Sequence, residues 1–311
     1  MAEGRLAIAG AVAALVACKG HREEGPPPLG KALTAVLAAA NSARAPWRCA
    51  ALDAPVLAAE KLGKWSTAEH TLTLADDNPE LVVGIVADTG GGAPATLAAL
   101  ARLRTKLAGA DLVVTLGGMG TTRAELEAVL GTLADHSTRP VVALPGDLED
   151  EAEQTAAIAA LRNKGDLVFD ARQARWIAAG GATLATLPGA GAIERLVAGA
   201  EGCEWRAPEV AQIYDALAQK PGLRVALASE SLRSGATGEL PLVPAAAVDV
   251  VVHGAAPLTP ARQGHRDGAK TELSPGTADA SPRLPETHTP SAGLLVIRGN
   301  SWSWRPLVDG R

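Results

Sequence analysis

The residues that could do chemistry lie in short turns, and each turn follows a run of apolar residues. The sequence reads VADTGG at 86–91, LVVTLGGMG at 112–120 and VVALPGDLED at 141–150. Carboxylate oxygens are ligands for hard cations, and glycine-rich turns expose backbone N–H groups that can hold an anion. The turns therefore indicate a carboxylate metal site or an anion-binding site.

Strands and helices must alternate to bring these turns together. Three continuous apolar runs are typical of strands buried on both faces: 81–87, 111–116 and 140–144. Pro94, Thr122 and Asp150 mark the starts of the helices that follow, because these residue types are favoured at the first helical positions. Parallel strands joined in this way end at one edge of a sheet, so we expect the turns to lie together there.

Beyond these helices the sequence becomes rich in strand patterns. We predict further strands at 166–170, 175–179, 182–187, 223–228, 248–253, 293–298 and 301–305. One more helix is predicted over 208–219, with apolar residues at helical spacing on one face. Residues 255–291 are dense in proline, glycine, serine and threonine, which predicts a long surface loop.

Two later turns complete a series of five: VALASES at 225–231 and VVVHGAAP at 250–257. The order and spacing of the five turns resemble those of the calcineurin-like metallophosphoesterases, over roughly residues 80–308. The resemblance implies an α/β fold, a metallophosphoesterase-like four-layer sandwich of two mixed β-sheets flanked by helices. It also implies a site in which carboxylates and imidazoles hold two metal ions that clamp a phosphate group and activate water.

Several ligand positions of that family hold other residues in this chain. In the pattern of the resembled family, Gly90 stands at the first histidine and Gly118 at the bridging aspartate. Leu148 stands at the histidine that would protonate the leaving group, and Ala255 and Ala256 stand at the last two histidines. None of these replacements can bind a metal. The positions that still match the family's motifs, or that hold another possible ligand, form a vestigial site. Its residues are Asp88, Gly117, Asp147 and Glu149. Within it, Asp88 and Asp147 are the candidate metal ligands, with Asp147 in place of an asparagine. We therefore predict no metal or a single divalent metal, rather than a two-metal centre.

A simpler interpretation stays open for both kinds of site. Aspartates such as Asp88 and Asp147 often accept backbone hydrogen bonds in turns. The candidate anion-binding residues lead from a strand into a helix: Gly118, Gly120, Thr121 and Thr122. Their N–H groups and the helix dipole could hold an anion, but a tight turn needs the same glycines.

The first residues have the layout of an export signal. Residues 1–17 combine a short positive start with an apolar stretch that is too short to span a bilayer. Their end, LVAC, resembles the lipobox of bacterial lipoproteins, which implies cleavage before Cys18 and lipidation of its thiol. We expect an exported protein of the bacterial cell envelope, on the periplasmic or surface side, held to the membrane by this lipid and the tether at 18–30.

The mature chain then divides into an N-terminal helical and irregular extension at 31–80 and the phosphoesterase-like domain at 81–311. Within the extension we expect a helix followed by a loop and short strands. Lipidation of Cys18 would leave Cys49 and Cys203 in an oxidising compartment, where we predict a disulfide between them. The alternative is two buried free thiols. The chain has 29 lysines and arginines against 34 aspartates and glutamates, a net charge of -5. This balance excludes the basic face that a nucleic-acid-binding protein needs.

We therefore predict a non-catalytic binding or scaffold module of the envelope, with other envelope proteins as partners. The alternative is a metal-dependent phosphoesterase with an altered metal site at Asp88, Asp147 and Glu149. The losses at the ligand positions favour the first prediction. The sequence indicates no substrate.

Overall fold

The computed structural model describes residues 48–75, 80–136, 138–179, 181–189, 202–230, 247–254, 262–267 and 270–310. The expected signal at 1–17, the lipidation site Cys18 and the tether at 18–30 lie outside these residues, and so do Ala255 and Ala256. Within them, no helix is long and apolar enough to cross a membrane.

A six-stranded mixed sheet carries the first three turns, with the strand order β15-β14-β4-β5-β6-β7. Its strands are β4 (Glu80–Val86), β5 (Leu112–Leu116), β6 (Val141–Leu144), β7 (Val168–Asp170), β14 (Ser291–Arg298) and β15 (Ser301–Val308). Strands β4 to β7 run parallel, whereas β14 is antiparallel to both β4 and β15. Leu116 pairs with Leu144, so β5 and β6 end level with each other.

The second sheet has nine strands, in the order β1-β2-β3-β8-β9-β10-β11-β13-β12. Its strands are β1 (Leu57–Leu62), β2 (Trp65–Glu69), β3 (Thr71–Leu74), β8 (Trp176–Ala179), β9 (Ala182–Leu187), β10 (Leu223–Ala228), β11 (Val250–His253), β12 (Arg262–Asp267) and β13 (Lys270–Ser274). The central strands β9, β10 and β11 are parallel, and antiparallel pairs lie on either side of them.

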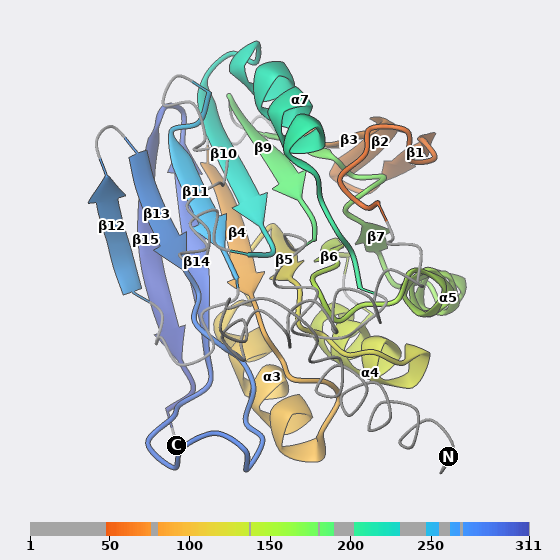
Figure 1. Ribbon diagram of the computed structural model, residues 1–311, viewed down its shortest axis with the longest axis vertical. Coiled ribbons are helices and arrows are strands. Elements are labelled where there is room, and N and C mark those ends of the chain that lie inside the picture. Colours follow the sequence, from red (N-terminus) through yellow and green to blue (C-terminus); the bar gives the residue numbers. More distant parts are fainter. Residues whose placement is uncertain are drawn as a thin grey trace, which may run out of the picture. The chain divides into compact units, whose positions relative to one another are not determined.

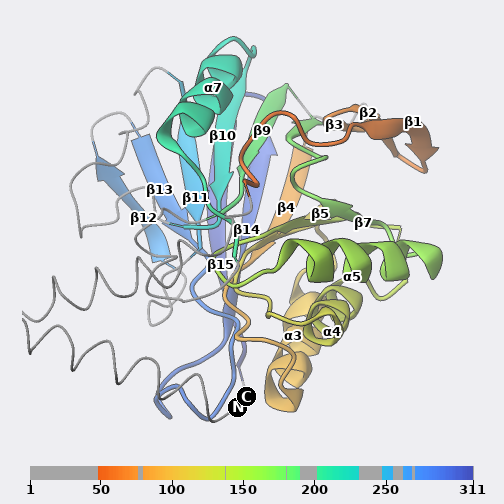
Figure 2. The ribbon, with the colours of Figure 1, turned by 45° about the vertical axis from the view of Figure 1, so that its right-hand side comes forward.

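Apolar side chains from both sheets form the central core between them, including Ile85 of β4 and Val225 of β10. Helices α3 (Pro94–Lys106), α4 (Arg123–Ala134) and α5 (Glu151–Asn163) cover the outer face of the six-stranded sheet. Helix α7 (Ala207–Ala218) covers the outer face of the nine-stranded sheet (Figures 1 and 2). This confirms the predicted four-layer sandwich of two mixed sheets flanked by helices.

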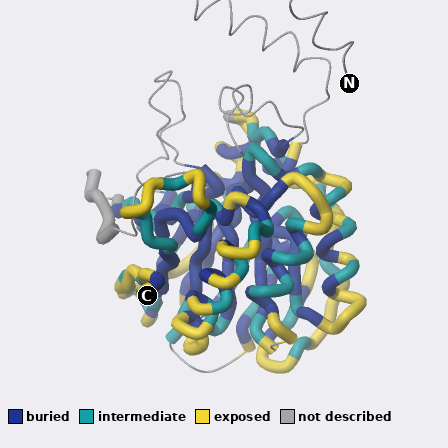
Figure 3. The backbone as a smooth tube through the Cα atoms, turned by 90° about the horizontal axis from the view of Figure 1, so that it is seen from below, coloured by how far each residue is buried: buried dark blue, intermediate teal, exposed yellow. Residues whose placement is uncertain are grey.

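Burial follows from this layering. The strands of the core are buried along most of their length, and the exposed residues gather on turns and outer helix faces (Figure 3). Strand β5 is buried at all five positions, as its continuous apolar run predicts. A strand of this kind has no solvent face and therefore needs no alternation of polar residues.

Local sequence signals fix where the helices begin. Thr122 is the N-cap of α4: its hydroxyl accepts from the backbone N–H of Glu125, and the Glu125 side chain completes a capping box. Asp150 caps α5 by accepting from the N–H groups of Ala152 and Glu153. The predicted starts of these two helices are confirmed.

One prediction about organisation differs from the structure. Part of the expected surface loop at 255–291 forms β12 and β13, because β13 pairs in parallel with β11 and buries Thr271 and Leu273. Strands β1 to β3 lie within the extension at 31–80, where short strands were expected. They extend the nine-stranded sheet through the parallel pairing of β3 with β8.

Candidate functional site

The first three turns meet at the carboxyl ends of β4, β5 and β6, as the parallel topology requires. The backbone N–H of Asp88 donates to Gly117 O at 3.1 Å, and that of Gly90 donates to Gly118 O at 3.0 Å. The hydroxyl of Thr89 also donates to Gly118 O. We call this meeting point of the turns at 87–93, 117–122 and 145–150 the ligand edge.

Asp88 has an unusual backbone conformation at the ligand edge, with a φ of 47° in the left-handed region. Its carbonyl accepts hydrogen bonds from the N–H of Asp279 and the hydroxyl of Thr277. Its side chain lies against the next turn, because a Cβ atom at position 118 would come within 2.6 Å of Asp88 Oδ1 and 2.8 Å of Asp88 Cα. Position 118, where the resembled family has a bridging aspartate, therefore accepts only glycine here.

Asp279 is a residue of the ligand edge that the sequence analysis missed. A Cβ atom at position 90 would lie 2.4 Å from Asp279 Oδ2, so a carboxylate occupies the space of the family's first histidine. The Asp279 side chain is held by the hydroxyl of Thr96 at 3.0 Å and by both the N–H and hydroxyl of Ser281. Because Asp279 falls in the segment predicted as a loop, no local pattern pointed to it.

Glu149 ties two of the turns together. Its side chain is fully buried and accepts hydrogen bonds from the N–H groups of Met119 and Gly146. Burial raises the pKa of Glu149 to about 7, and the negative charge of Asp147 acts in the same direction. The hydrogen bonds lower the pKa but do not outweigh burial. This carboxylate is therefore committed to backbone donors within the protein.

The candidate anion site is occupied by a side chain of the protein itself. The N–H groups of Thr121 and Thr122 donate to Glu125 Oε2 at 3.0 and 3.1 Å. Burial alone would raise the pKa of Glu125, but these hydrogen bonds lower it below its usual value. An external anion at the predicted site of Gly118, Gly120, Thr121 and Thr122 would therefore have to displace this bound carboxylate.

The donor set of the ligand edge does not fit a two-metal centre. Asp88 and Asp147 are both half-buried there. Among the described residues, no three histidine, cysteine, aspartate or glutamate side chains gather closely enough to hold a metal ion. His253, at the end of β11, places its Nδ1 2.9 Å from Gly254 O. The hydroxyl of Ser229, which directly follows β10, donates to Pro145 O at 2.8 Å and so bonds the turn at 145–150 to the nine-stranded sheet.

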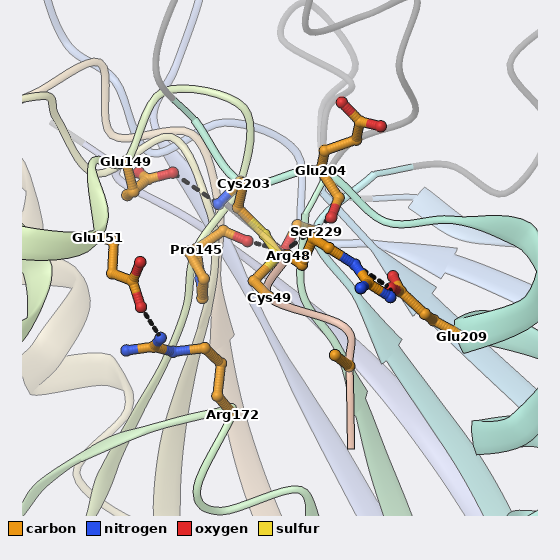
Figure 4. Close-up of a disulfide and its surroundings, with 12 residues drawn as sticks. Arg48, Cys49, Pro145, Glu149, Glu151, Arg172, Cys203, Glu204, Glu209 and Ser229 are labelled. Atoms are coloured by element: carbon orange, nitrogen blue, oxygen red, sulfur yellow. Dashed lines mark hydrogen bonds and ion pairs between the residues drawn. A yellow bond between two sulfur atoms is a disulfide. The ribbon is translucent and has the colours of Figure 1, made fainter. Parts of the chain in front are cut away.

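Cys49 and Cys203 form a disulfide beside the ligand edge, with their Cα atoms 5.6 Å apart (Figure 4). Both residues are fully buried. The N–H of Cys203 donates to Gly146 O at 3.1 Å, so the disulfide lies directly behind the turn that carries Asp147. Of the two states that the sequence leaves open, the structure has the bonded one.

Comparisons with known proteins agree with this architecture. No family model matches the chain, and no curated protein matches it. One solved crystal structure matches with a TM-score of 0.51 and 11% identity, over 74% of this chain and 100% of that chain. The protein TT1561 of Thermus thermophilus matches with a TM-score of 0.49 and 16% identity, over 72% of this chain and 98% of that chain.

The phosphoesterase Yfce from E. coli is similar with a TM-score of 0.34 and 15% identity, over 72% of this chain and 98% of that chain. The structure with the TM-score of 0.51 shows the fold alone: this chain shares with it an architecture of two mixed sheets with outer helices. A shared fold does not by itself carry an activity over.

Proposed function

We propose that this protein is a non-catalytic binding or scaffold module built on a phosphoesterase-like fold. One observation carries the proposal: the protein's own groups fill the ligand edge. The carboxylate of Asp279 takes the space beside Gly90, and the side chain of Asp88 takes the space beside Gly118. Glu149 and Glu125 accept the backbone N–H groups that could otherwise face a ligand.

The chemistry of hydrolysis supports the same conclusion. Two-metal hydrolysis of a phosphate ester needs a bridging ligand to set the ions close together, and a group that protonates the leaving oxygen. Gly118 and Leu148 stand at those positions and can supply neither. Restoring the bridge would require the turn at Asp88 to move, since it lies within 2.8 Å of the missing Cβ.

The alternative is a phosphoesterase with an altered, single-metal site at Asp88, Asp147 and Glu149. The backbone of Asp88 favours it, because a φ of 47° in a residue other than glycine is a strain that often marks functional sites. Against it, both oxygens of Glu149 already accept backbone hydrogen bonds. The three carboxylates would also lack an imidazole to complete a transition-metal site.

Metal uptake distinguishes the two functions. We expect the purified full-length chain to retain no metal after incubation with Mn²⁺, Fe²⁺ or Zn²⁺ and desalting, and to show no hydrolysis of a simple aryl phosphate diester. Elemental analysis of the desalted protein measures the first, and release of the phenol measures the second.

A pair of retained metal ions would overturn the proposal and restore a two-metal enzyme. One retained ion, lost together with turnover in Asp88→Ala, would establish the altered site. Asp53→Ala is the matched control, because Asp53 is an exposed turn residue that does not belong to the three turns of the ligand edge. Loss of metal in both variants would point to general destabilisation instead.

We also propose that the protein is an exported lipoprotein anchored at Cys18 and that its partners are proteins of the cell envelope. The support is the sequence before Cys18, with its apolar stretch and small residues. Lipid chains would hold residues 41–311, which form one compact unit, at a membrane surface.

Changing the cysteine tests this anchor. In the bacterium of origin, Cys18→Ala should move the protein out of the membrane fraction and abolish incorporation of labelled fatty acid, because the acylated thiol is lost. Fractionation followed by immunoblotting measures the first effect. Lys19→Ala is the control and should stay in the membrane fraction; unchanged membrane association of Cys18→Ala would contradict the anchor.

A further inference from the structure

The segment at 202–204 lies across one turn of the ligand edge. The N–H of Cys203 donates to Gly146 O at 3.1 Å. Gly202 is packed so closely on the same turn that a Cβ atom there would lie 1.7 Å from Asp147 O. We call residues 202–204 the cysteine strap. It covers the backbone of the residues that carry the candidate ligand Asp147.

The other half of the disulfide is fixed to the body of the protein. The buried guanidinium of Arg175 donates to Cys49 O at 3.0 Å and to Ala51 O at 3.2 Å. The same side chain donates to Thr186 O of β9 at 3.0 Å. The backbone of Cys49 is therefore held to the nine-stranded sheet through Arg175. The disulfide bonds the strap covalently to this fixed residue.

Both sulfur atoms pack closely against Gly189. A Cβ atom at Gly189 would lie 2.5 Å from Cys203 Sγ and 2.7 Å from Cys49 Sγ. The N–H of Gly189 donates to Pro145 O, which also accepts from the hydroxyl of Ser229 (Figure 4). The disulfide thus lies at a point where the strand ends of both sheets meet.

The contacts that flank the disulfide are weaker than the covalent bond. Arg48, next to Cys49, forms an ion pair with Glu209 at the start of α7. The Arg48 side chain is 50% exposed, so water and salt screen this pair. On the strap itself, the backbone of Cys203 is tied to the ligand edge by its hydrogen bond to Gly146. A single hydrogen bond of this kind can be broken by local motion.

We propose that oxidation of Cys49 and Cys203 is the step that closes the ligand edge. In the reduced chain the cysteine strap is released from the turn at 145–150, and disulfide formation locks the strap onto it. The physiological timing, after export, rests on the proposed envelope location. The closure itself rests only on the contacts of the strap.

The chemistry is thiol–disulfide exchange with a disulfide-bearing oxidant. One cysteine thiolate attacks the oxidant's disulfide and forms a mixed disulfide, releasing one oxidant thiol. The second cysteine thiolate then attacks the protein's own sulfur in that mixed disulfide, which forms the Cys49–Cys203 bond. The oxidant leaves as a dithiol that carries the two electrons and two protons.

Amide hydrogen exchange of the full-length chain tests the closure. In the variant Cys49→Ser/Cys203→Ser, we expect the amides of residues 146–150 and 202–204 to exchange at least about tenfold faster than in the oxidised wild type. The amides of β4 and β5 should keep their protection, because the central core does not touch the strap. Mass spectrometry of peptides that cover these segments gives the rates.

Leu130→Ala is the matched control, since Leu130 is a buried residue of α4 in the outer core cluster and its truncation destabilises the protein without touching the strap. Faster exchange at 146–150 in Leu130→Ala as well would show opening by global unfolding, and the proposal would be overturned. Unchanged exchange at 146–150 in the serine variant would overturn it too.

Gly202→Ala supplies a second route if the serine variant does not fold. It keeps both cysteines but places a methyl group on Asp147 O, so the strap must lift while the disulfide stays intact. We expect faster exchange at 146–150, with the bond verified by intact mass. Protection equal to that of the wild type would mean that the strap does not close the edge. Metal content plays no part in these readouts, so the proposed function can fail separately.

Discussion

Gly118→Asp should destabilise the protein by about 2 to 5 kcal/mol and should not create a metal site. The change restores the type of residue that bridges metals in the resembled family. However, its Cβ atom would lie 2.6 Å from Asp88 Oδ1 and 2.8 Å from Asp88 Cα. A φ of +68° at this position adds the cost of holding a side chain in the left-handed region. Unfolding by urea, followed by circular dichroism, measures the change in free energy.

Gly63→Asp is the matched control for backbone strain. Gly63 has a φ of +63°, and a Cβ atom added to it would have no neighbour within 4 Å. This variant should lose only about 1 kcal/mol, because it bears the strain without the collision. Equal losses in the two variants would contradict the idea that Asp88 blocks position 118. Metal retention by Gly118→Asp would contradict the closed ligand edge more generally.

The stability of the wild type should fall as the pH rises from about 5 to about 8, by an amount of the order of 3 kcal/mol that Glu149→Gln lacks. Glu149 has a pKa of about 7 in the folded protein, against an ordinary value of 4.5. Between these values the folded state holds a proton that the unfolded state has lost. The contribution of Glu149 to the free energy of unfolding is therefore greatest below pH 4.5, its ordinary pKa. This contribution is lost as the pH rises through about 7, the pKa in the folded protein.

The measured quantity is the difference in free energy of unfolding between wild type and Glu149→Gln at the two pH values. Other titrating groups contribute to both proteins and cancel. Glu125→Gln is the control: hydrogen bonds lower the pKa of Glu125 below 4.5, so its carboxylate stays ionised over this range. Its difference from wild type should not change between the two pH values. A constant difference for Glu149→Gln would rule out a buried, titrating carboxylate.

The sequence by itself determined most of the six-stranded sheet and its helices. The apolar runs that became β4, β5 and β6 are buried on both faces, so each strand was visible without knowledge of its partners. Thr122 and Asp150 act through hydrogen bonds to residues two or three positions further on, and such local contacts are readable from sequence.

Strands β12 and β13 were missed for the opposite reason. Their composition is that of a loop, and β13 is a strand because β11 offers it a parallel partner from a distant part of the chain. Short strands were expected in the region of β1 to β3, but their place in the nine-stranded sheet comes from the pairing of β3 with β8. Pairing of this kind depends on long-range contacts, which local propensity does not encode.

At the ligand edge, the sequence identified the positions but not their occupants. It located Asp88, Gly118 and Asp147 after the correct strands, because parallel topology brings strand ends together. Only the tertiary structure decided that Asp279 fills the space beside Gly90 and that Glu149 bonds two turns. Residues 90 and 279 lie far apart along the chain, and the fold alone sets the space between their side chains.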